Sequence, residues 1–249
     1  GLKLLSLHNA KGHWGYLFGD VSYNGWWYYY PVALAVKTPL TFLSLAIAGF
    51  GFAAYRGIAE RDWRILAPIL CCVAILAVMC TFNRVNSGIR HILILYPLLA
   101  IGIGGLVGHA WQRRNGTLVT IAAALLLWQG VQSAVTHPDY LADFNLLAGK
   151  NPDRILIDSD LDWGQDLNRL GREIERRKID LVHVRYYGTA DVSRHVPNAV
   201  VLDLSRPTTG WIAVSATTRA TSGPELDWLR AHEPVTQIGR SIDLYYIAP

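Results

Sequence analysis

Four long apolar segments dominate the first 136 residues of this chain. They are 18 or 20 residues long and comprise Thr38–Tyr55, Ile65–Phe82, Ile92–Trp111 and Leu118–Val135. At about 1.5 Å per helical residue, each approaches the roughly 30 Å thickness of a bilayer's hydrocarbon core. We therefore predict four transmembrane helices within residues 31–136, an arrangement that an ordinary soluble domain does not contain.

Charge divides the chain into two parts of different character. Residues 1–136 hold ten Lys and Arg against three Asp and Glu, whereas residues 137–249 hold thirteen against sixteen. This division indicates a membrane part followed by a water-facing part. No basic helix and no aromatic pattern of an RNA-binding sheet occurs, so the sequence does not favour a nucleic-acid partner.

The loops between the apolar segments predict how the bundle is oriented. Arg56, Arg61 and Arg64 follow the first segment, and Arg113 and Arg114 follow the third. The positive-inside rule puts both loops in the cytoplasm. Residues 1–30, the loop 83–91 and the domain 137–249 are then expected outside the cytoplasm.

The loop NRVNSGIRH, from Asn83 to His91, breaks that charge rule because it carries Arg84, Arg90 and His91. Cations at the mouth of a membrane bundle are costly to desolvate, so we expect them to meet an anionic ligand. Ordinary loop charges are the alternative. Lys37, at the outer end of the first segment, either extends to the interface or adds to the same anion site.

Residues 1–30 are predicted to form an interfacial loop. The segment ends in five consecutive aromatic residues, Trp26 to Tyr30, whose amphipathic rings suit the headgroup layer. The three cysteines lie within one apolar segment and predict no disulfide framework. The glycine clusters at 49–51 and 102–105 lie inside apolar segments, where they favour close helix packing.

Residues 137–249 predict a small α/β domain, since short strand-like runs alternate with helical patterns. The expected helices are Gly164–Lys178 and a segment near Pro224–His232. The expected strands are Arg154–Ile157, Leu181–Tyr187, Ala199–Leu202, Trp211–Ser215, Val235–Ile238 and Ile242–Ile247. The predicted architecture is thus a four-span α-helical transmembrane bundle followed by an extracytoplasmic α/β domain.

The sequence DSDLDWGQD, residues 158–166, is the densest acidic cluster and precedes the first predicted helix of that domain. An EF-hand loop is excluded because its sixth and twelfth positions would be Trp163 and Arg169. An Asp-x-Asp pattern for a metal–nucleotide-sugar, helix capping and an acceptor-contacting surface remain open. The residues concerned are Asp158, Asp160, Asp162, Gln165 and Asp166. No metal-ligand motif and no hydrolase motif occurs.

Three stretches resemble a known family. YLFGDVSYNGWWYYYPVALAVKTPL (Tyr16–Leu40), GIRHILILYP (Gly88–Pro97) and HPDYLADFNLLAGKNPDRILIDSDLDWGQDLNRL (His137–Leu170) resemble the C-terminal half of bacterial family 39-like membrane glycosyltransferases. These are relatives of the protein O-mannosyltransferases and aminoarabinose transferases with the GT-C fold. The resemblance covers about the first 170 residues.

The resemblance implies an enzyme of the bacterial inner membrane. It would move a sugar from a polyprenyl-phosphate donor to an extracytoplasmic glycan, lipid or protein acceptor. It implies that Arg90 and His91, together with Arg84 and Lys37, bind the donor's phosphate, and that Tyr96 shapes the site. The family's catalytic carboxylate lies in the first extracytoplasmic loop, which this chain does not contain. We therefore expect an inactive C-terminal fragment, and the resemblance fixes neither a cofactor nor a divalent metal.

Two rival hypotheses remain. The chain could be a non-catalytic, membrane-anchored module whose outer α/β domain binds a glycan or a protein. It could also be part of a transporter for a lipid carrier, which we disfavour because no apolar segment has a charge at its centre.

Overall fold

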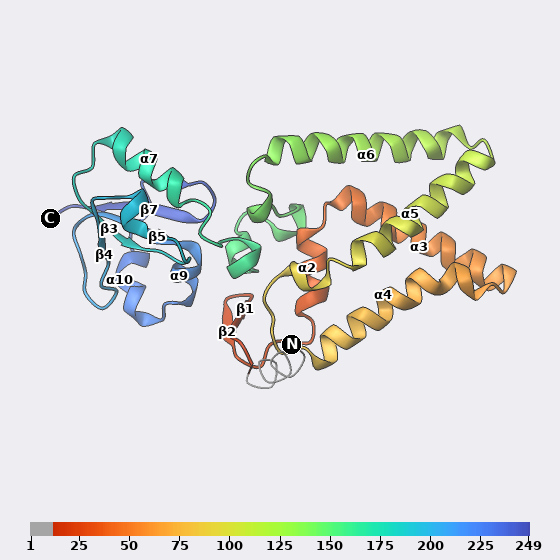
Figure 1. The fold of residues 1–249 in the computed structure, drawn as a ribbon, viewed down its shortest axis with the longest axis horizontal. Coiled ribbons are helices and arrows are strands. Elements are labelled where there is room, and N and C mark those ends of the chain that lie inside the picture. Colours follow the sequence, from red (N-terminus) through yellow and green to blue (C-terminus); the bar gives the residue numbers. More distant parts are fainter. Residues whose placement is uncertain (1–11) are drawn as a thin grey trace. The chain divides into compact units, whose positions relative to one another are not determined.

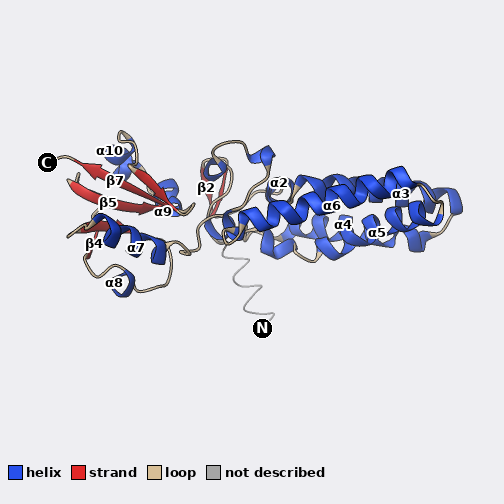
Figure 2. Cartoon of the chain, turned by 90° about the horizontal axis from the view of Figure 1, so that it is seen from above, coloured by secondary structure: helices blue, strands red, loops and turns tan. Residues whose placement is uncertain are grey.

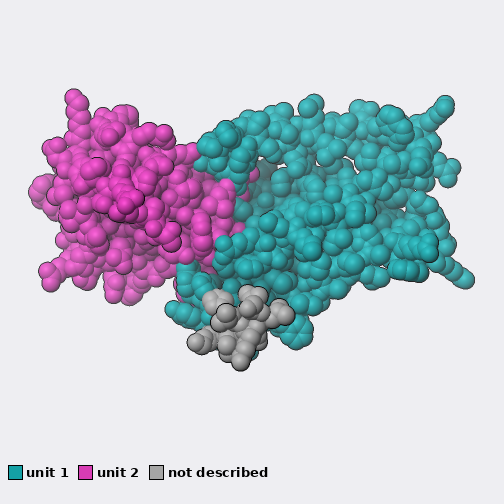
Figure 3. Space-filling model, in the orientation of Figure 1, with its two compact units in different colours: residues 1–15, 22–140, 144–150 teal, residues 16–21, 141–143, 151–249 magenta. Residues whose placement is uncertain are grey.

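The computed structural model describes residues 12–249 and divides the chain into two compact units, coloured separately in Figure 3. The helical unit comprises residues up to 15, 22–140 and 144–150. The sheet unit comprises residues 16–21, 141–143 and 151–249. The sequence placed the division at residue 137, whereas the structure keeps most of residues 137–150 with the helices.

The helical unit contains five α-helices among its described residues, and a short 3₁₀ helix, η1, precedes the fourth of them (Figure 1). They are α2 (Tyr29–Lys37), α3 (Leu40–Glu60), α4 (Trp63–Phe82), η1 (Ile89–Ile92), α5 (Leu95–Gln112) and α6 (Gly116–Thr136). Three of them, α3, α4 and α6, are long and apolar enough to cross a membrane. Helix α5 is not among the three. Helix α5 has 18 residues, whereas the predicted segment Ile92–Trp111 has 20. The start of that segment forms the end of η1 and a turn instead of α-helix.

Two glycines allow α3 and α5 to approach closely. A side chain at Gly49 would overlap the backbone of Gly102, and one at Gly102 would overlap the ring of Phe50. The predicted role in close packing is therefore confirmed for these two positions. It is wrong for Gly51, Gly104 and Gly105, where an added Cβ would meet open space.

A single asparagine ties the segment after α6 to the break between α2 and α3. The Asn145 side-chain amide donates to the carbonyl oxygens of Ala35 and Thr38, both at 2.6 Å. Its backbone N–H donates to the Val36 carbonyl at 2.9 Å. These carbonyls lie at the end of α2, where Pro39 prevents a continuous helix. Asn145 thus explains why residues 144–150 belong to the helical unit.

The region predicted as an interfacial loop contains regular structure. Strands β1 (Gly15–Leu17) and β2 (Asp20–Ser22) pair, and α2 begins at Tyr29. The side chains of Tyr29 and Tyr30 are 2% and 0% exposed, so the expectation that these rings face the headgroup layer is wrong. Trp27, by contrast, is 71% exposed. Residues 1–11 of the predicted loop lie outside the described residues.

The sheet unit is built on five strands in the order β4-β3-β5-β7-β6. Strands β4, β3 and β5 are parallel, while β7 is antiparallel to both β5 and β6. The bounds are β3 (Val182–Arg185), β4 (Ala199–Val201), β5 (Gly210–Ser215), β6 (Thr236–Ile238) and β7 (Ile242–Ile247). A mixed sheet of this kind confirms the predicted α/β class.

Helices cover both faces of this sheet. Figures 1 and 2 show α7 (Leu167–Arg177) on the face opposite to α10 (Asp227–Arg230). On the α7 face, Leu170 and Ile174 pack with strand residues such as Val182. On the α10 face, Leu229 packs with Ile212. The unit therefore has one buried core on each side of the sheet, as helix-covered sheets require.

Five of the six predicted strands are confirmed, and one is wrong. Arg154–Ile157 is not a strand, because Asn151-Pro152 starts a short 3₁₀ helix, η4 (Pro152–Arg154). Leu156 and Ile157 are nevertheless fully buried, as predicted for that run. An apolar run bounded by turn residues predicts burial more reliably than it predicts strand pairing.

Candidate functional site

The segment from Asn83 to His91, here called the cation loop, follows α4 in the helical unit and includes most of η1. Its middle is buried, since Asn86 and Ser87 are 2% and 4% exposed. Arg84, Arg90 and His91 are exposed. The structure therefore presents the three predicted cations around a buried backbone turn.

Two tyrosines in the first turn of α2 fix the shape of the cation loop. The Tyr29 hydroxyl accepts the Gly88 N–H at 2.9 Å. The Tyr30 hydroxyl donates to the Val85 carbonyl and accepts from the Asn83 side-chain amide, both at 2.8 Å. These bonds join residues more than 50 positions apart in the sequence. Buried hydroxyls with partners on both sides define one loop geometry.

The Asn86 side chain has a partner for its oxygen but none for its nitrogen among the described residues. The Trp26 N–H donates to the Asn86 side-chain oxygen at 2.5 Å. The amide nitrogen of the same Asn86 side chain is buried and has no hydrogen-bond partner among the described residues. Buried donors of this kind are uncommon in folded proteins, and each carries a cost of about 1–3 kcal/mol.

Arg90 and His91 have defined neighbours in the loop region. The Arg90 guanidinium donates to the Ser87 hydroxyl at 2.9 Å. The His91 ring lies edge-on to Tyr30, with 6.5 Å between ring centroids. Tyr30 therefore contacts both Asn83 at the start of the loop and His91 at its end. An exposed guanidinium held in this way can offer two parallel N–H groups to a phosphate.

Lys37 and Tyr96 lie near the other end of α2. The Lys37 ammonium sits over the Phe144 ring, 3.9 Å from its centroid. The Tyr96 hydroxyl is 2.9 Å from the Thr38 hydroxyl. Lys37 was expected either to extend to the interface or to join the anion site, and its cation–π contact is a third role. Tyr96 ties the start of α5 to the end of α2.

The acidic segment of residues 158–166 belongs to the sheet unit, and all four of its carboxylates are buried. Asp158, Asp160, Asp162 and Asp166 are 5%, 1%, 0% and 1% exposed. Buried carboxylates need hydrogen bonds or charged partners. Their accessibility does not suit a surface that contacts an acceptor.

Asp162 links the acidic segment by hydrogen bonds to residues that follow β5. One carboxylate oxygen accepts the Gly164 N–H at 3.2 Å, and the other accepts the Thr217 N–H at 3.0 Å. Burial raises the pKa of this carboxyl above its usual value, although hydrogen bonds from Thr217, Gly164 and Ser215 act in the opposite direction. Desolvation disfavours the charged form, and here it outweighs the stabilising donors.

Asp166 links the acidic segment by hydrogen bonds to the turn between β6 and β7. One oxygen accepts from the Arg240 N–H, the Ser241 N–H and the Ser241 hydroxyl, at 2.8–3.1 Å. The other accepts from the Arg169 guanidinium at 2.8 Å. Asp166 therefore links the start of α7 to a turn that is distant in the sequence.

The predicted capping of the first helix by Asp160 or Asp162 is wrong. Helix α7 begins at Leu167 with no side-chain capping bond. The Asp162 carboxylate instead accepts a backbone N–H at the start of α9 (Ala216–Thr221). Asp158 accepts the Tyr187 hydroxyl at 2.9 Å, and the Gln165 side chain bonds the backbone of Leu161 and Trp163. The acidic segment therefore has a structural role, because its buried side chains link separate parts of the sheet unit.

Within residues 12–249, no three His, Cys, Asp or Glu side chains are arranged to hold a metal ion.

A cleft that sequence reasoning missed lies at the carboxyl ends of the parallel strands. Its larger part has a volume of about 370 Å³ and is lined by residues following β3 and by α9. A neighbouring part of about 300 Å³ is lined by residues following β4 and by Glu225. Arg185, Val201 and Leu204 line both parts. Only the strand order brings these residues together, and periodicity does not reveal strand order.

Comparison with protein-family models, with curated proteins and with solved structures finds no match to this chain. Its function must therefore be argued from the geometry described above.

Proposed function

We propose that the chain is the C-terminal part of an integral-membrane glycosyltransferase. The enzyme would take a sugar from a polyprenyl-phosphate donor and transfer it to an extracytoplasmic acceptor. In this proposal α5 is a fourth membrane span, and the sheet unit lies outside the cytoplasm. The cation loop binds the phosphate of the donor.

The observation that carries the proposal is the bracing of the cation loop by buried tyrosines. Tyr29 and Tyr30 hold its backbone through three hydrogen bonds of 2.8–2.9 Å. A loop whose only task is to connect two helices does not need this reinforcement. A binding loop does, because a fixed geometry lowers the entropy lost when a ligand binds.

The charges of the loop suit a phosphate monoester or diester. Arg90 offers a planar fork of donors, while Arg84 and His91 add positive charge nearby. At the edge of a bilayer, partial exclusion of water strengthens such pairs. A phosphate oxygen is also an acceptor of the kind that the Asn86 amide nitrogen lacks.

The acidic segment is not assigned a catalytic role in this proposal. A general base must be able to reach the acceptor hydroxyl. The carboxylates of Asp158, Asp162 and Asp166 are buried and already accept hydrogen bonds from their own unit. The base that activates the acceptor would come from another part of a longer polypeptide, as the family resemblance implies.

Binding of a short-chain polyprenyl phosphate to the full-length protein in lipid nanodiscs tests the proposal. We expect Arg90→Ala to weaken binding about 10- to 100-fold, because a hydrogen bond to a charged group contributes about 1.5–3 kcal/mol. Arg90→Lys keeps the charge but loses the planar fork of donors, so its affinity should lie between those of Arg90→Ala and the unchanged protein.

Arg113→Ala is the matched control, since Arg113 is an exposed arginine in the loop between α5 and α6. The control should bind like the unchanged protein. The corresponding polyprenyl alcohol, which lacks the phosphate, should not distinguish the variants. Equal phosphate binding by Arg90→Ala and the unchanged protein would remove the cation loop from the donor site.

A further inference from the structure

The cleft in the sheet unit lies at a switch point of the sheet. Strand β3 is the central one of three parallel strands, with β4 on one side and β5 on the other. The chain after β3 enters α8 (Val192–His195). Val192 packs against the core under α7, and Val196, the residue after the helix, belongs to that core. The chain after β5 enters α9, which Figure 1 shows on the α10 side. Where successive connections leave to opposite faces, a crevice opens at the carboxyl ends of the strands, and ligands bind there.

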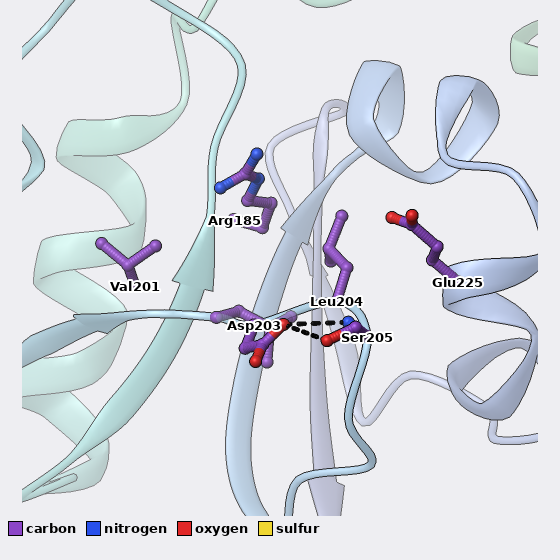
Figure 4. A pocket seen from close by; sticks show the side chains of 7 residues that line it. Arg185, Val201, Asp203, Leu204, Ser205 and Glu225 are labelled. Carbon is purple, nitrogen blue, oxygen red and sulfur yellow. Dashed lines mark hydrogen bonds between the residues drawn. The ribbon is translucent and has the colours of Figure 1, made fainter.

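The cleft carries opposite charges that have no partner. Figure 4 shows the Arg185 guanidinium and the Glu225 carboxylate on either side of the Leu204 side chain. Neither side chain forms a hydrogen bond or ion pair with another described residue, although both line the cleft. The Ser222 hydroxyl, in the larger part of the cleft, also makes no such bond. The cleft therefore offers unused donors and unused acceptors together.

Asp203 adds a second carboxylate. Its oxygen accepts the Ser205 hydroxyl at 2.7 Å and the Ser205 N–H at 3.0 Å, as the dashed lines in Figure 4 indicate. These two bonds, first the hydroxyl and then the backbone N–H, lower the pKa of the carboxyl, with a smaller effect of Arg206. Asp203 is thus ionised at neutral pH, and a carboxylate oxygen can accept several hydrogen bonds.

These charges discriminate between classes of ligand. An anion would meet the carboxylates of Asp203 and Glu225, and a cation would meet Arg185. A hydroxyl-rich neutral ligand satisfies all three, since each hydroxyl both donates and accepts. The exposed apolar surface of Val201 and Leu204 can cover the C–H face of a sugar ring.

We propose that this cleft binds a carbohydrate, with Arg185, Glu225 and Asp203 contacting sugar hydroxyls. Hydroxyls of Thr218, Thr221 and Ser222 line the larger part and extend the polar surface. The site lies wholly within the sheet unit and shares no residue with the cation loop. The proposal therefore does not depend on binding of a lipid-linked donor.

Saturation-transfer NMR on the full chain in detergent tests this inference. The probes are three neutral trisaccharides, built from mannose, from glucose and from N-acetylglucosamine, with inorganic phosphate as the anionic probe. We expect saturable binding of at least one trisaccharide. Arg185→Ala and Glu225→Gln should each weaken it about 10-fold, which corresponds to the loss of about one hydrogen bond to a charged group.

Two matched variants act as controls. Arg194→Ala removes an exposed arginine of α8 that is 3.6 Å from Asp191, and Asp227→Asn removes an exposed carboxylate of α10 that pairs with Arg230. Neither residue lines the cleft, and both variants should bind the trisaccharide normally. Failure of all three trisaccharides to bind would overturn the inference. So would stronger binding of phosphate than of any sugar, or an unchanged affinity in Arg185→Ala.

Discussion

At the scale of single residues, Asp162 predicts how the stability of the sheet unit depends on pH. Burial raises the pKa of this carboxyl above its ordinary value of 3.8. The folded protein therefore holds the proton more tightly than the unfolded chain does. It follows that the contribution of Asp162 to stability is largest at low pH and is lost as pH rises from 3.8 through the folded-state pKa.

Thermal unfolding of Asp162→Asn and of the unchanged protein over this pH range measures that contribution. An asparagine cannot ionise, so the stability advantage of the unchanged protein over the variant should shrink as the pH rises. Thr189→Ala, at an exposed position of the same unit that carries no ionisable group, is the control and should give a constant difference. An advantage over Asp162→Asn that stays constant or grows with pH would show that desolvation does not dominate at this carboxyl.

The acidic segment of residues 158–166 also shows which properties of single residues cannot be predicted from the sequence. Its burial and the positions of its partners were not predictable, because Thr217 is 55 residues from Asp162 and Ser241 is 75 residues from Asp166. A dense run of carboxylates suggested a metal pattern, a cap or an acceptor surface. The fold instead uses Asp162 to bind a backbone N–H of α9 and Asp166 to bind those of the turn between β6 and β7, which no local pattern encodes.

At the scale of elements, hydrophobic periodicity predicted most helices and strands, with boundaries shifted by a few residues. It failed where the local signal was ambiguous. The five aromatic residues around the start of α2, Trp26 to Tyr30, suit a membrane interface as well as a buried contact, and only the tertiary structure decides. Tyr30 is buried because its hydroxyl bonds both Asn83 and Val85. The same ambiguity hid the Arg154–Ile157 turn, where Pro152 favours a 3₁₀ helix.

Removing the Tyr30 hydroxyl tests whether α2 braces the cation loop. In Tyr30→Phe, the Val85 carbonyl loses its donor and the Asn83 amide loses an acceptor in a partly buried place. We expect a loss of about 1–3 kcal/mol and a clear decrease in the thermal midpoint of the helical unit.

Tyr23→Phe serves as the control because the Tyr23 side chain is 67% exposed, and it should unfold like the unchanged protein. Hydrogen exchange of the Gly88 N–H gives an independent measurement. It should become faster in Tyr30→Phe if the loop loosens. Equal midpoints for both tyrosine variants would contradict the bracing role.

At the scale of the whole molecule, the decisive question is whether α5 crosses the membrane. Its 18 residues extend about 27 Å, slightly less than the roughly 30 Å hydrocarbon core. A short span of this kind is tolerated through local thinning of the bilayer. The arginines at 56, 61 and 64 and at 113 and 114 satisfy the positive-inside rule together only if α5 does cross. We therefore predict four spans.

Labelling of single cysteines in intact bacteria with a membrane-impermeant maleimide decides this prediction. The background protein has its three native cysteines replaced, all of which are free and lie in α4. Cysteines are then introduced one at a time at Asn24, Arg113 and Thr189, which are exposed. Four spans place Asn24 and Thr189 on the outer face, so Asn24→Cys and Thr189→Cys should label while Arg113→Cys should not. Three spans reverse the last two results, because α6 would then return the chain to the cytoplasm. Labelling of Arg113→Cys without Thr189→Cys would thus reject both the fourth span and an extracytoplasmic sheet unit.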